Sequence, residues 1–217
     1  MTLLALDTST AATVVAVGDA NGGLLADARH DPAAGDRPGH TSELLALAEQ
    51  ALTAAGIAWG DLDEIAVSVG PGGFTGLRVG LATARSLASS LGLATRPVVS
   101  LDALAAGAPR GDQRPVIAAI DARRGELFAR RYGAGGAPQD EPSAVTPAAL
   151  ACDGSLVIGD GAIRYREVIE AAGGRVPAAD DLRHAISTAG LLAAAVAATQ
   201  GELVPLYLRQ PDAEPSR

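Results

Sequence analysis

The sequence lacks lysine altogether, has few aromatic residues and contains a single cysteine, Cys152. Aromatic residues make up 3% of the chain, whereas apolar residues as a class make up 48%. A core of this composition must be built mainly from Ala, Leu, Val and Ile. One cysteine excludes a disulfide within the chain and a cluster of thiolate ligands around a metal.

All 17 basic residues are arginines, and 25 acidic residues give the chain a net charge of −8. Binding of nucleic acid depends on neutralising phosphates, which requires a basic surface. An acidic chain without lysine is therefore a poor stand-alone nucleic-acid binder, and its charge also disfavours an anionic membrane surface. The apolar content, set against only 19% charged residues, excludes a disordered chain.

Long hydrophobic runs are missing as well. The longest uncharged apolar stretch, residues 185–201, contains polar side chains and falls short of the roughly 20 apolar residues that a membrane span needs. We interpret this stretch as a buried or half-buried helix. The residues up to Asp7 lack the charged segment that begins a signal peptide. A soluble, cytoplasmic protein without membrane contact is therefore expected.

Apolar patterning in the first half predicts three closely spaced strands, followed by alternating helices and strands. A helix is expected from Thr41 to Ala55, ended by Gly56, and a longer one from about Phe74 to Leu91. The predicted strands and one short helical turn cover residues 3–6, 13–17, 23–28, 65–69, 96–99 and 102–106.

A segment rich in Gly, Pro and Arg, residues 107–115, is interpreted as a linker to a second half. That half is predicted to contain a hairpin, a strand and two helices, at residues 116–121 with 126–132, 155–159, 164–172 and 185–199. This order favours two α/β lobes over one doubly wound sheet. We expect an N-terminal lobe at residues 1–106 and a smaller C-terminal lobe at 107–217, with a flexible tail from about 210.

The most informative segment is GPGGFTGLRVG, residues 70–80, between a predicted strand and a predicted helix. Its backbone N–H groups could cradle an anion at the helix N-terminus. It is not a P-loop, because no Lys-Ser/Thr pair follows, and its glycine spacing is one residue too long for a dinucleotide fingerprint. The alternative, favoured by the spacing alone, is a tight turn whose glycines let helix and strand pack closely.

Other polar residues give weaker signals. Asp7 could hold a metal-bound water near a phosphate, but a turn in which its carboxylate accepts local N–H groups is favoured. The three histidines have no helical metal-ligand spacing. Cys152 is interpreted as a buried or incidental thiol. The charged turn at residues 121–126 could meet a partner or simply be solvated.

Both long predicted helices have unusual faces. The outer side of the helix at residues 74–91 carries small or weakly polar side chains, is edged by Arg78 and Arg85, and has no acid. The helix at residues 41–55 is apolar over about half of its circumference, which is more than one core contact requires. Such faces favour close packing against other helices.

Several motifs together resemble the TsaB (YeaZ) family. They are Leu6-Asp7-Thr8-Ser9, the 70–80 segment, Asp121-Ala122-Arg123 with Glu126, Gly159-Asp160-Gly161-Ala162, and Pro205 to Arg209. They follow one another in the family's order over nearly the whole chain. The 70–80 segment is long and specific, whereas the others are weak singly. One departure is Gly73, where the family usually has Ser.

This resemblance implies an α/β, actin/Hsp70-like (ASKHA, RNase H-like) fold with two lobes, each a mixed sheet flanked by helices. It also implies a role in making threonylcarbamoyladenosine (t6A) in tRNAs that read codons beginning with A. In that family the protein is a non-catalytic partner of its paralogue TsaD, which carries the metal and transfers the threonylcarbamoyl group. The ATPase TsaE joins the pair. The tRNA is then met only through the complex, and the chain alone is expected to form a homodimer.

The resemblance implies no catalytic residue, metal or cofactor in this chain. TsaD has a His-x-x-x-His metal pair, and its two positions are occupied here by Leu101 and Ala105, neither of which can ligate a metal. Asp7, Gly159 and Gly161 are secondary candidates for cofactor binding.

In the family, the two long helices meet the equivalent pair of TsaD in a four-helix contact. Arg78 and Arg85 are expected to pair with acids on that partner. The alternative is a solvent-facing helix side rich in Ala and Ser. The expected interface residues are His40, Leu45, Leu52, Arg78, Val79, Ala82, Arg85 and Ser86.

Two other functions stay open. Asp7, the 70–80 segment and the Gly159-Asp160-Gly161 turn would suit an actin-like nucleotide hydrolase, or an M22-type glycoprotease-like enzyme. A tRNA-binding module is the third hypothesis, and the charge balance disfavours it.

Overall fold

The computed structural model describes residues 1–19, 21–33, 35–108 and 114–209. The first sheet has five strands in the order β3-β2-β1-β4-β5, and it is mixed because β1 pairs antiparallel with β2 and parallel with β4. All five strands were expected from the sequence, to within about two residues at each end. They are β1 (Thr2–Asp7), β2 (Thr13–Asp19), β3 (Leu24–His30), β4 (Glu64–Gly70) and β5 (Ala94–Val99).

The second sheet has four strands in the order β8-β7-β6-β9. β6 and β7 form the predicted hairpin. β8 was not predicted, because a strand of three residues is too short to show an alternating pattern. The strands are β6 (Val116–Arg123), β7 (Glu126–Tyr132), β8 (Ser143–Val145) and β9 (Leu156–Ile158).

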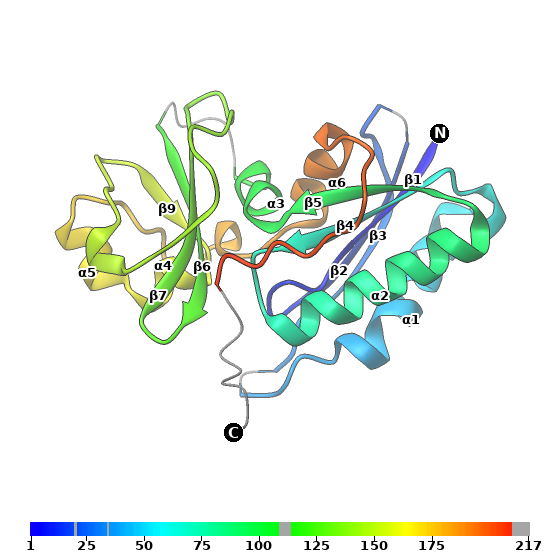
Figure 1. The fold of residues 1–217 in the computed structure, drawn as a ribbon, viewed down its shortest axis with the longest axis horizontal. Coiled ribbons are helices and arrows are strands. Elements are labelled where there is room, and N and C mark those ends of the chain that lie inside the picture. Colours follow the sequence, from blue (N-terminus) through cyan, green and yellow to red (C-terminus); the bar gives the residue numbers. More distant parts are fainter. Residues whose placement is uncertain (20, 34, 109–113, 210–217) are drawn as a thin grey trace, which may run out of the picture.

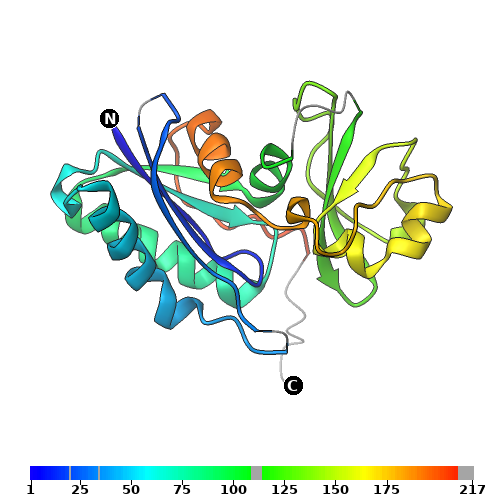
Figure 2. The same ribbon diagram turned by 180° about the vertical axis from the view of Figure 1, so that it is seen from behind.

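Helices and sheets alternate in layers (Figures 1 and 2). α1 (His40–Ala55) and α2 (Phe74–Leu91) cover the outer face of the first sheet. α3 (Ser100–Ala106) and α6 (Thr188–Ala197) lie between the two sheets, while α4 (Asp160–Arg164) and α5 (Arg166–Ala171) cover the far face of the second. Short 3₁₀ helices span Trp59–Asp61, Pro147–Ala149 and Leu182–His184.

The alternation of side chains along β1 divides them between two cores. Leu4 and Leu6 pack with α1 and α2, whereas Leu3 and Ala5 pack with α3 and α6. Because both faces of this sheet are covered, its inner strands are nearly continuous apolar runs, as buried parallel pairs require. α1 and α2 end at Gly56 and Gly92, which adopt the left-handed conformation that glycine tolerates best.

α6 corrects the expected division of the chain at residue 107. This helix packs on β1 and β2 and against α3, so it belongs with the first sheet. Beyond it the chain stays there, because the Gly201 N–H donates to the Thr95 carbonyl (3.0 Å) and the Leu206 N–H donates to the Val69 carbonyl (2.8 Å). α6 supplies the apolar cover of the inner face of the first sheet, whereas Leu203 and Leu206 beyond it pack with the outer core under α1 and α2.

Smaller differences concern boundaries. The helix predicted at residues 164–172 is divided at Tyr165 into α4 and α5, and α6 is shorter than the predicted 185–199 because Ser187 caps it. The tail predicted from about 210, and most of the predicted linker, lie outside the described residues. Within the part of the chain that the structure describes, no helix combines the length and hydropathy needed to cross a bilayer.

Candidate functional site

The glycine-rich segment packs the start of α2 onto the turn after β1. A Cβ at Gly72 would lie 2.3 Å from the Ser9 carbonyl oxygen, and a Cβ at Gly76 would lie 2.1 Å from the Thr8 carbonyl oxygen. The Gly73 N–H donates to the Ser9 carbonyl (2.8 Å). The close-packing interpretation of this segment is therefore correct, since its glycines admit backbone where a side chain would clash.

His40 lies beneath this contact and not on the surface. It is 6% exposed, its Nδ1 is 2.8 Å from the Thr13 Oγ1, and a Cβ at Gly76 would come within 3.1 Å of its ring. Burial lowers the pKa of His40 below its ordinary value, so the ring is neutral at pH 7. The expectation that His40 contacts a partner from the helix face is therefore wrong, because the start of α1 is tucked against β2 and α2.

Asp7 closes the turn between β1 and β2. Its Oδ1 accepts hydrogen bonds from the Ser9 hydroxyl (2.6 Å) and the Ser9 N–H (3.3 Å), as the favoured turn interpretation predicts. The side chain is fully buried, and that burial raises the pKa of the carboxyl above its ordinary value. Among the described residues, no group of three or more acids, histidines or cysteines could hold a metal.

The two glycines proposed for cofactor binding are used in packing. A Cβ at Gly159 would lie 2.1 Å from the Ala119 carbonyl oxygen, and one at Gly161 would lie 2.5 Å from the Leu127 side chain. They bring the start of α4 close to the second sheet. The residue between them, Asp160, accepts a hydrogen bond from the Asp121 N–H (3.0 Å), and burial raises the pKa of its carboxyl.

The paired helices α1 and α2 lie side by side on the outside of the first sheet and present a broad surface (Figure 1). We call the exposed part of this surface the α1–α2 face. Leu45 is 53% exposed there, and Arg78, Ala82, Arg85 and Ser86 are also exposed, while Val79 is half-buried.

Leu52 does not belong to this face. It is 2% exposed and packs in the core beneath α1, so its expected role at an interface is wrong. Most of the wide apolar side of α1 is buried against β2, β3 and α2. In the same way Leu91, expected in the core, is 38% exposed at the end of α2.

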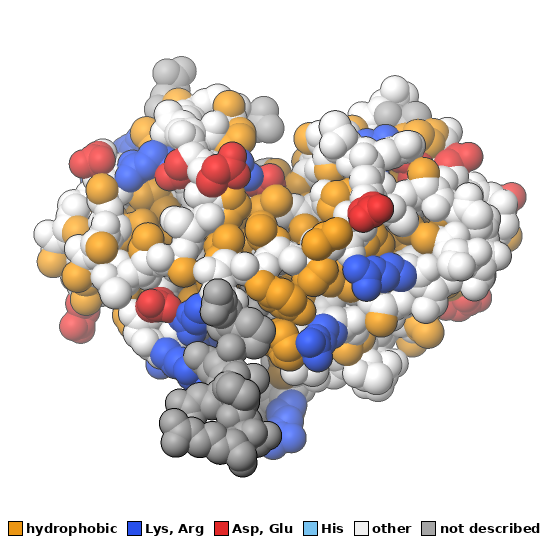
Figure 3. All heavy atoms as spheres, viewed as in Figure 1, with side chains coloured by type: hydrophobic (Ala, Val, Ile, Leu, Met, Phe, Trp, Pro, Cys, Tyr) orange, Lys and Arg blue, Asp and Glu red, His pale blue; other side chains and the backbone are white. Residues whose placement is uncertain are grey.

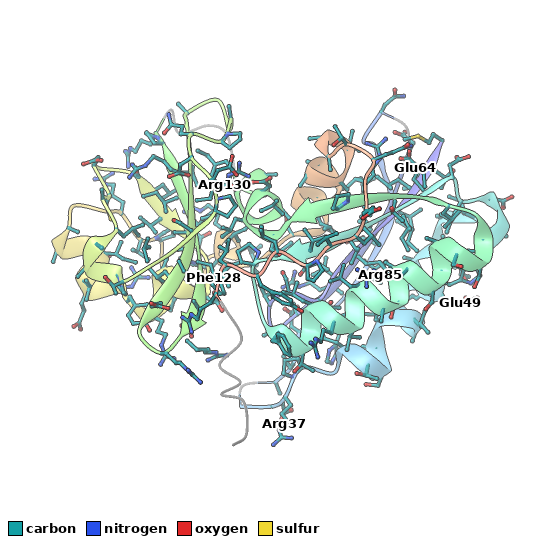
Figure 4. All side chains as sticks on the ribbon, viewed as in Figure 1. Arg37, Glu49, Glu64, Arg85, Phe128 and Arg130 are labelled. Carbon is teal, nitrogen blue, oxygen red and sulfur yellow. The ribbon has the colours of Figure 1, made fainter. Side chains whose placement is uncertain are left out.

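The two arginines of the α1–α2 face have different environments. Arg78 lies over the ring of Phe74, with its guanidinium carbon 4.0 Å from the ring centroid. Arg85 donates a hydrogen bond to the Leu203 carbonyl in the C-terminal segment, and Figure 4 shows it on the side of α2 next to that segment. Each guanidinium keeps further N–H donors for other partners.

A cavity of about 840 Å³ opens between the lobes. Its walls are the β1–β2 turn, the first turn of α2, the β6–β7 hairpin with Asp160, and residues 206–209. The C-terminal segment bridges the lobes here, because Arg209 pairs with Glu126 of β7. Phe128 lies at the boundary between the lobes (Figure 4).

Sequence reasoning missed several residues of this cavity, namely Arg37, Phe74, Tyr207 and Asp160. Tyr207 and Asp160 stood inside motifs that carried the family resemblance, but nothing in the sequence placed those motifs together. Cys152 was judged correctly as a buried thiol: it is 1% exposed, and burial raises its pKa.

The chain matches the family model described as TsaD, tRNA N6-adenosine threonylcarbamoyltransferase, over residues 36–199. An uncharacterized protein of Mycobacterium tuberculosis is 39% identical over 173 residues, which cover 79% of this chain and 74% of the relative. YeaZ from Pseudomonas aeruginosa has a similar structure, with a TM-score of 0.79 at 28% identity over 95% of this chain and 99% of that one. The chain belongs to the TsaB (YeaZ) family, within the group that the TsaD model describes.

The similarity to YeaZ extends over both lobes, and it confirms the two-lobed, actin/Hsp70-like α/β fold that the resemblance implied. TsaB from Haemophilus influenzae is 38% identical to this TsaB-family chain over 131 residues. That match covers 59% of the chain and 52% of the relative. The Haemophilus influenzae relative is named a tRNA threonylcarbamoyladenosine biosynthesis protein.

Proposed function

We propose that this chain is the non-catalytic subunit required for t6A formation in tRNA, where it binds and activates TsaD together with TsaE. Membership of the TsaB family supports the role in t6A biosynthesis. The observation that carries the proposal is the α1–α2 face, a helical surface of small and weakly polar side chains left uncovered beside Leu45.

Small side chains suit this face to a helix-on-helix contact. Ala82 and Ser86 are exposed one turn apart on α2, and Val79 lies on the same side. Because no bulky group stands between them, the axis of a partner helix can approach the axis of α2 to roughly 8–10 Å, the separation of closely packed helices. Arg78 and Arg85 border this strip, where they can donate bidentate hydrogen bonds to acids of the partner.

The chemistry of the positions that correspond to the TsaD metal pair supports a non-catalytic role. Leu101 is fully buried between the sheets, and Ala105 has only a methyl group. Hydrocarbon side chains offer no lone pair to a metal. We infer that the chemistry takes place on TsaD and that this chain meets tRNA as part of the assembly.

Substitution of Ala82 tests the interface. Ala82→Arg places a long cation in the strip and should weaken binding to TsaD by about 100-fold or more, because the contact core excludes unpaired charge. Size-exclusion chromatography and calorimetry of the mixed proteins provide the measurement. Ala171→Arg, at an exposed alanine of α5 in the other lobe, is the matched control and should bind like the unchanged chain.

Equal TsaD binding by both variants would overturn the assignment of the face. In that case t6A formation by the reconstituted proteins still reports on the role of the chain, because the assay depends on the assembly and not on one surface. We also propose that the chain alone forms a homodimer through the same face, so Ala82→Arg should convert it to a monomer.

The cavity between the lobes is large enough for a small ligand, which keeps an actin-like nucleotide hydrolase as the second candidate to be tested. Calorimetry with ATP and Mg²⁺ separates the two functions. Micromolar binding and turnover by the isolated chain would support the hydrolase and contradict the non-catalytic role.

A further inference from the structure

The mouth of the cavity between the lobes is basic although the chain is acidic. Among the described residues its lining contains Arg37, Arg123, Arg124 and Arg209 and two acids, Asp121 and Asp160. The net charge of the whole chain is −8, so the acids are concentrated elsewhere. In Figure 3, arginine side chains gather on both sides of this region. A basic concavity on an acidic protein attracts anions locally.

Two of the nearby guanidinium groups have no carboxylate partner among the described residues. Arg37 is exposed beyond the N-terminal end of α2 (Figure 4), and Arg78 contacts the ring of Phe74. Arg123 and Arg209, in contrast, are held by Asp121 and Glu126. The mouth therefore combines Arg123 and Arg209, which are held in place by carboxylates, with Arg37, which projects into solvent.

An aromatic pair lies at the same place. The rings of Phe74 and Tyr207 have centroids 5.5 Å apart at an interplanar angle of 34°, and the residues are 46% and 40% exposed. They come from the start of α2 and from the C-terminal segment. In a chain with few aromatics, two rings that stay partly exposed, with a guanidinium over the Phe74 ring, form a tilted aromatic platform next to positive charge.

We propose that this mouth binds an unpaired stretch of RNA, with a base stacked on the Phe74–Tyr207 pair and phosphates held by Arg37 and Arg123. Aromatic rings next to arginines are the combination by which proteins hold single strands, since every base has a π-face and every linkage has a charge. The inference rests on the proposed function, because the RNA available to the assembly is its tRNA substrate.

The geometry favours an RNA strand over a free nucleotide or an acidic peptide. At the start of α2, where backbone N–H groups could cradle a free nucleotide's phosphates, the Gly73 N–H already donates to the Ser9 carbonyl, which leaves one donor fewer for such a ligand. The carboxylates of an acidic peptide would pair with the arginines but would make no stacking contact with the Phe74–Tyr207 pair. An RNA strand uses both, and the open cavity of about 840 Å³ lets it enter and leave.

The chain's overall charge explains why this surface works within an assembly. Phosphate contacts weaken steeply with salt, and repulsion from a chain of net charge −8 opposes long-range attraction. We therefore expect weak RNA binding by the isolated chain and a measurable contribution when TsaD holds the same tRNA.

The test measures affinity of the reconstituted complex with TsaD for an unmodified tRNA transcript that reads a codon beginning with A, by fluorescence anisotropy at several salt concentrations. Tyr207→Ala should weaken binding about tenfold, whereas Tyr207→Phe, which keeps the ring, should bind like the unchanged protein. Arg37→Ala should lower the slope of log affinity against log salt by roughly 0.7 to 0.9. Arg175→Ala, at an exposed arginine outside the cavity, is the control.

Co-elution with TsaD and thermal unfolding of each variant show whether assembly and folding are intact. If Tyr207→Ala and Arg37→Ala bind tRNA as tightly as the control while still assembling, the RNA inference is overturned and the proposed function stands. If none of the proteins assembles with TsaD or supports t6A formation, the proposed function fails instead. Loss of ATP binding with unchanged tRNA binding in Tyr207→Ala would assign the platform to a nucleotide and also overturn the inference.

Discussion

α2 and α6 are both rich in small residues and lie on opposite faces of the same sheet, yet they differ in what covers them. α6 is buried between the two sheets and exposes only Ala189, Ala193 and Ala197 among its described residues, a single stripe along the helix. α2 buries one side on the sheet, and the residues that the structure describes leave a broad side of it exposed.

The difference lies in the large side chains and not in the alanines. α6 places Leu191 and Leu192 in the core between the lobes, whereas the buried leucines of α2, Leu77 and Leu81, lie on one side of that helix. A helix that is apolar on nearly every side requires cover on two faces, and a helix with one apolar stripe requires one. The open side of α2 is therefore available for a partner.

The largest effect is expected in α6. Leu191→Ala should lower the free energy of unfolding by about 2–5 kcal/mol, because the fully buried side chain leaves a cavity between two sheets that cannot collapse onto it. Urea unfolding measures the change. Leu182→Ala, at a residue that is 87% exposed, should change stability by less than about 0.5 kcal/mol. A small loss in Leu191→Ala would contradict the sandwiched position of α6.

An intermediate effect is expected where α6 ends. Arg96 donates to the carbonyls of Val196 and Ala198 and is held by the Glu64 carboxylate, whose Oε2 is 2.5 Å from its Nε. Glu64→Gln should cost about 1–3 kcal/mol at pH 7, because it leaves a guanidinium without its ionic partner.

The cost should depend on pH in a defined direction. The Arg96 guanidinium, as the main cause, lowers the pKa of Glu64 below its ordinary 4.5 in the folded chain. The stabilisation is therefore complete above pH 4.5 and is lost as the pH falls through the folded-state pKa. Unfolding curves of the two proteins should converge on acidification. A constant gap down to pH 3 would show that the carboxylate does not hold α6.

The smallest effect is expected on the open side of α2. Ser89 is exposed there, so Ser89→Ala should raise stability by only about 0.3–0.5 kcal/mol through helix propensity. Differential scanning calorimetry can resolve the shift. Destabilisation by more than about 1 kcal/mol would mean that this side of α2 packs against the protein itself.

The sequence predicted α2 over Phe74–Leu91, and the structure has the same bounds, because a glycine turn precedes the helix and Gly92 ends it. Periodicity also predicted the five strands of the first sheet. It failed for His40 and Leu52, because helical spacing shows which residues share a side but not how deep a neighbouring element buries them. The cavity could not be predicted for another reason: Arg37, Phe74 and Tyr207, which line it, are far apart in the sequence.

Local chemistry was enough to predict most of the helices and strands, the two-lobed α/β class and the close packing at the glycine segment, since these depend on spacing, turn residues and apolar periodicity. Only the tertiary structure decided that the C-terminal residues return to cover the first sheet and bring Tyr207 beside Phe74. Such contacts arise because burial of an apolar sheet face is favourable whichever segment of the chain covers it. The apolar pattern of a strand shows that one of its faces needs cover, but it does not show which distant segment provides that cover.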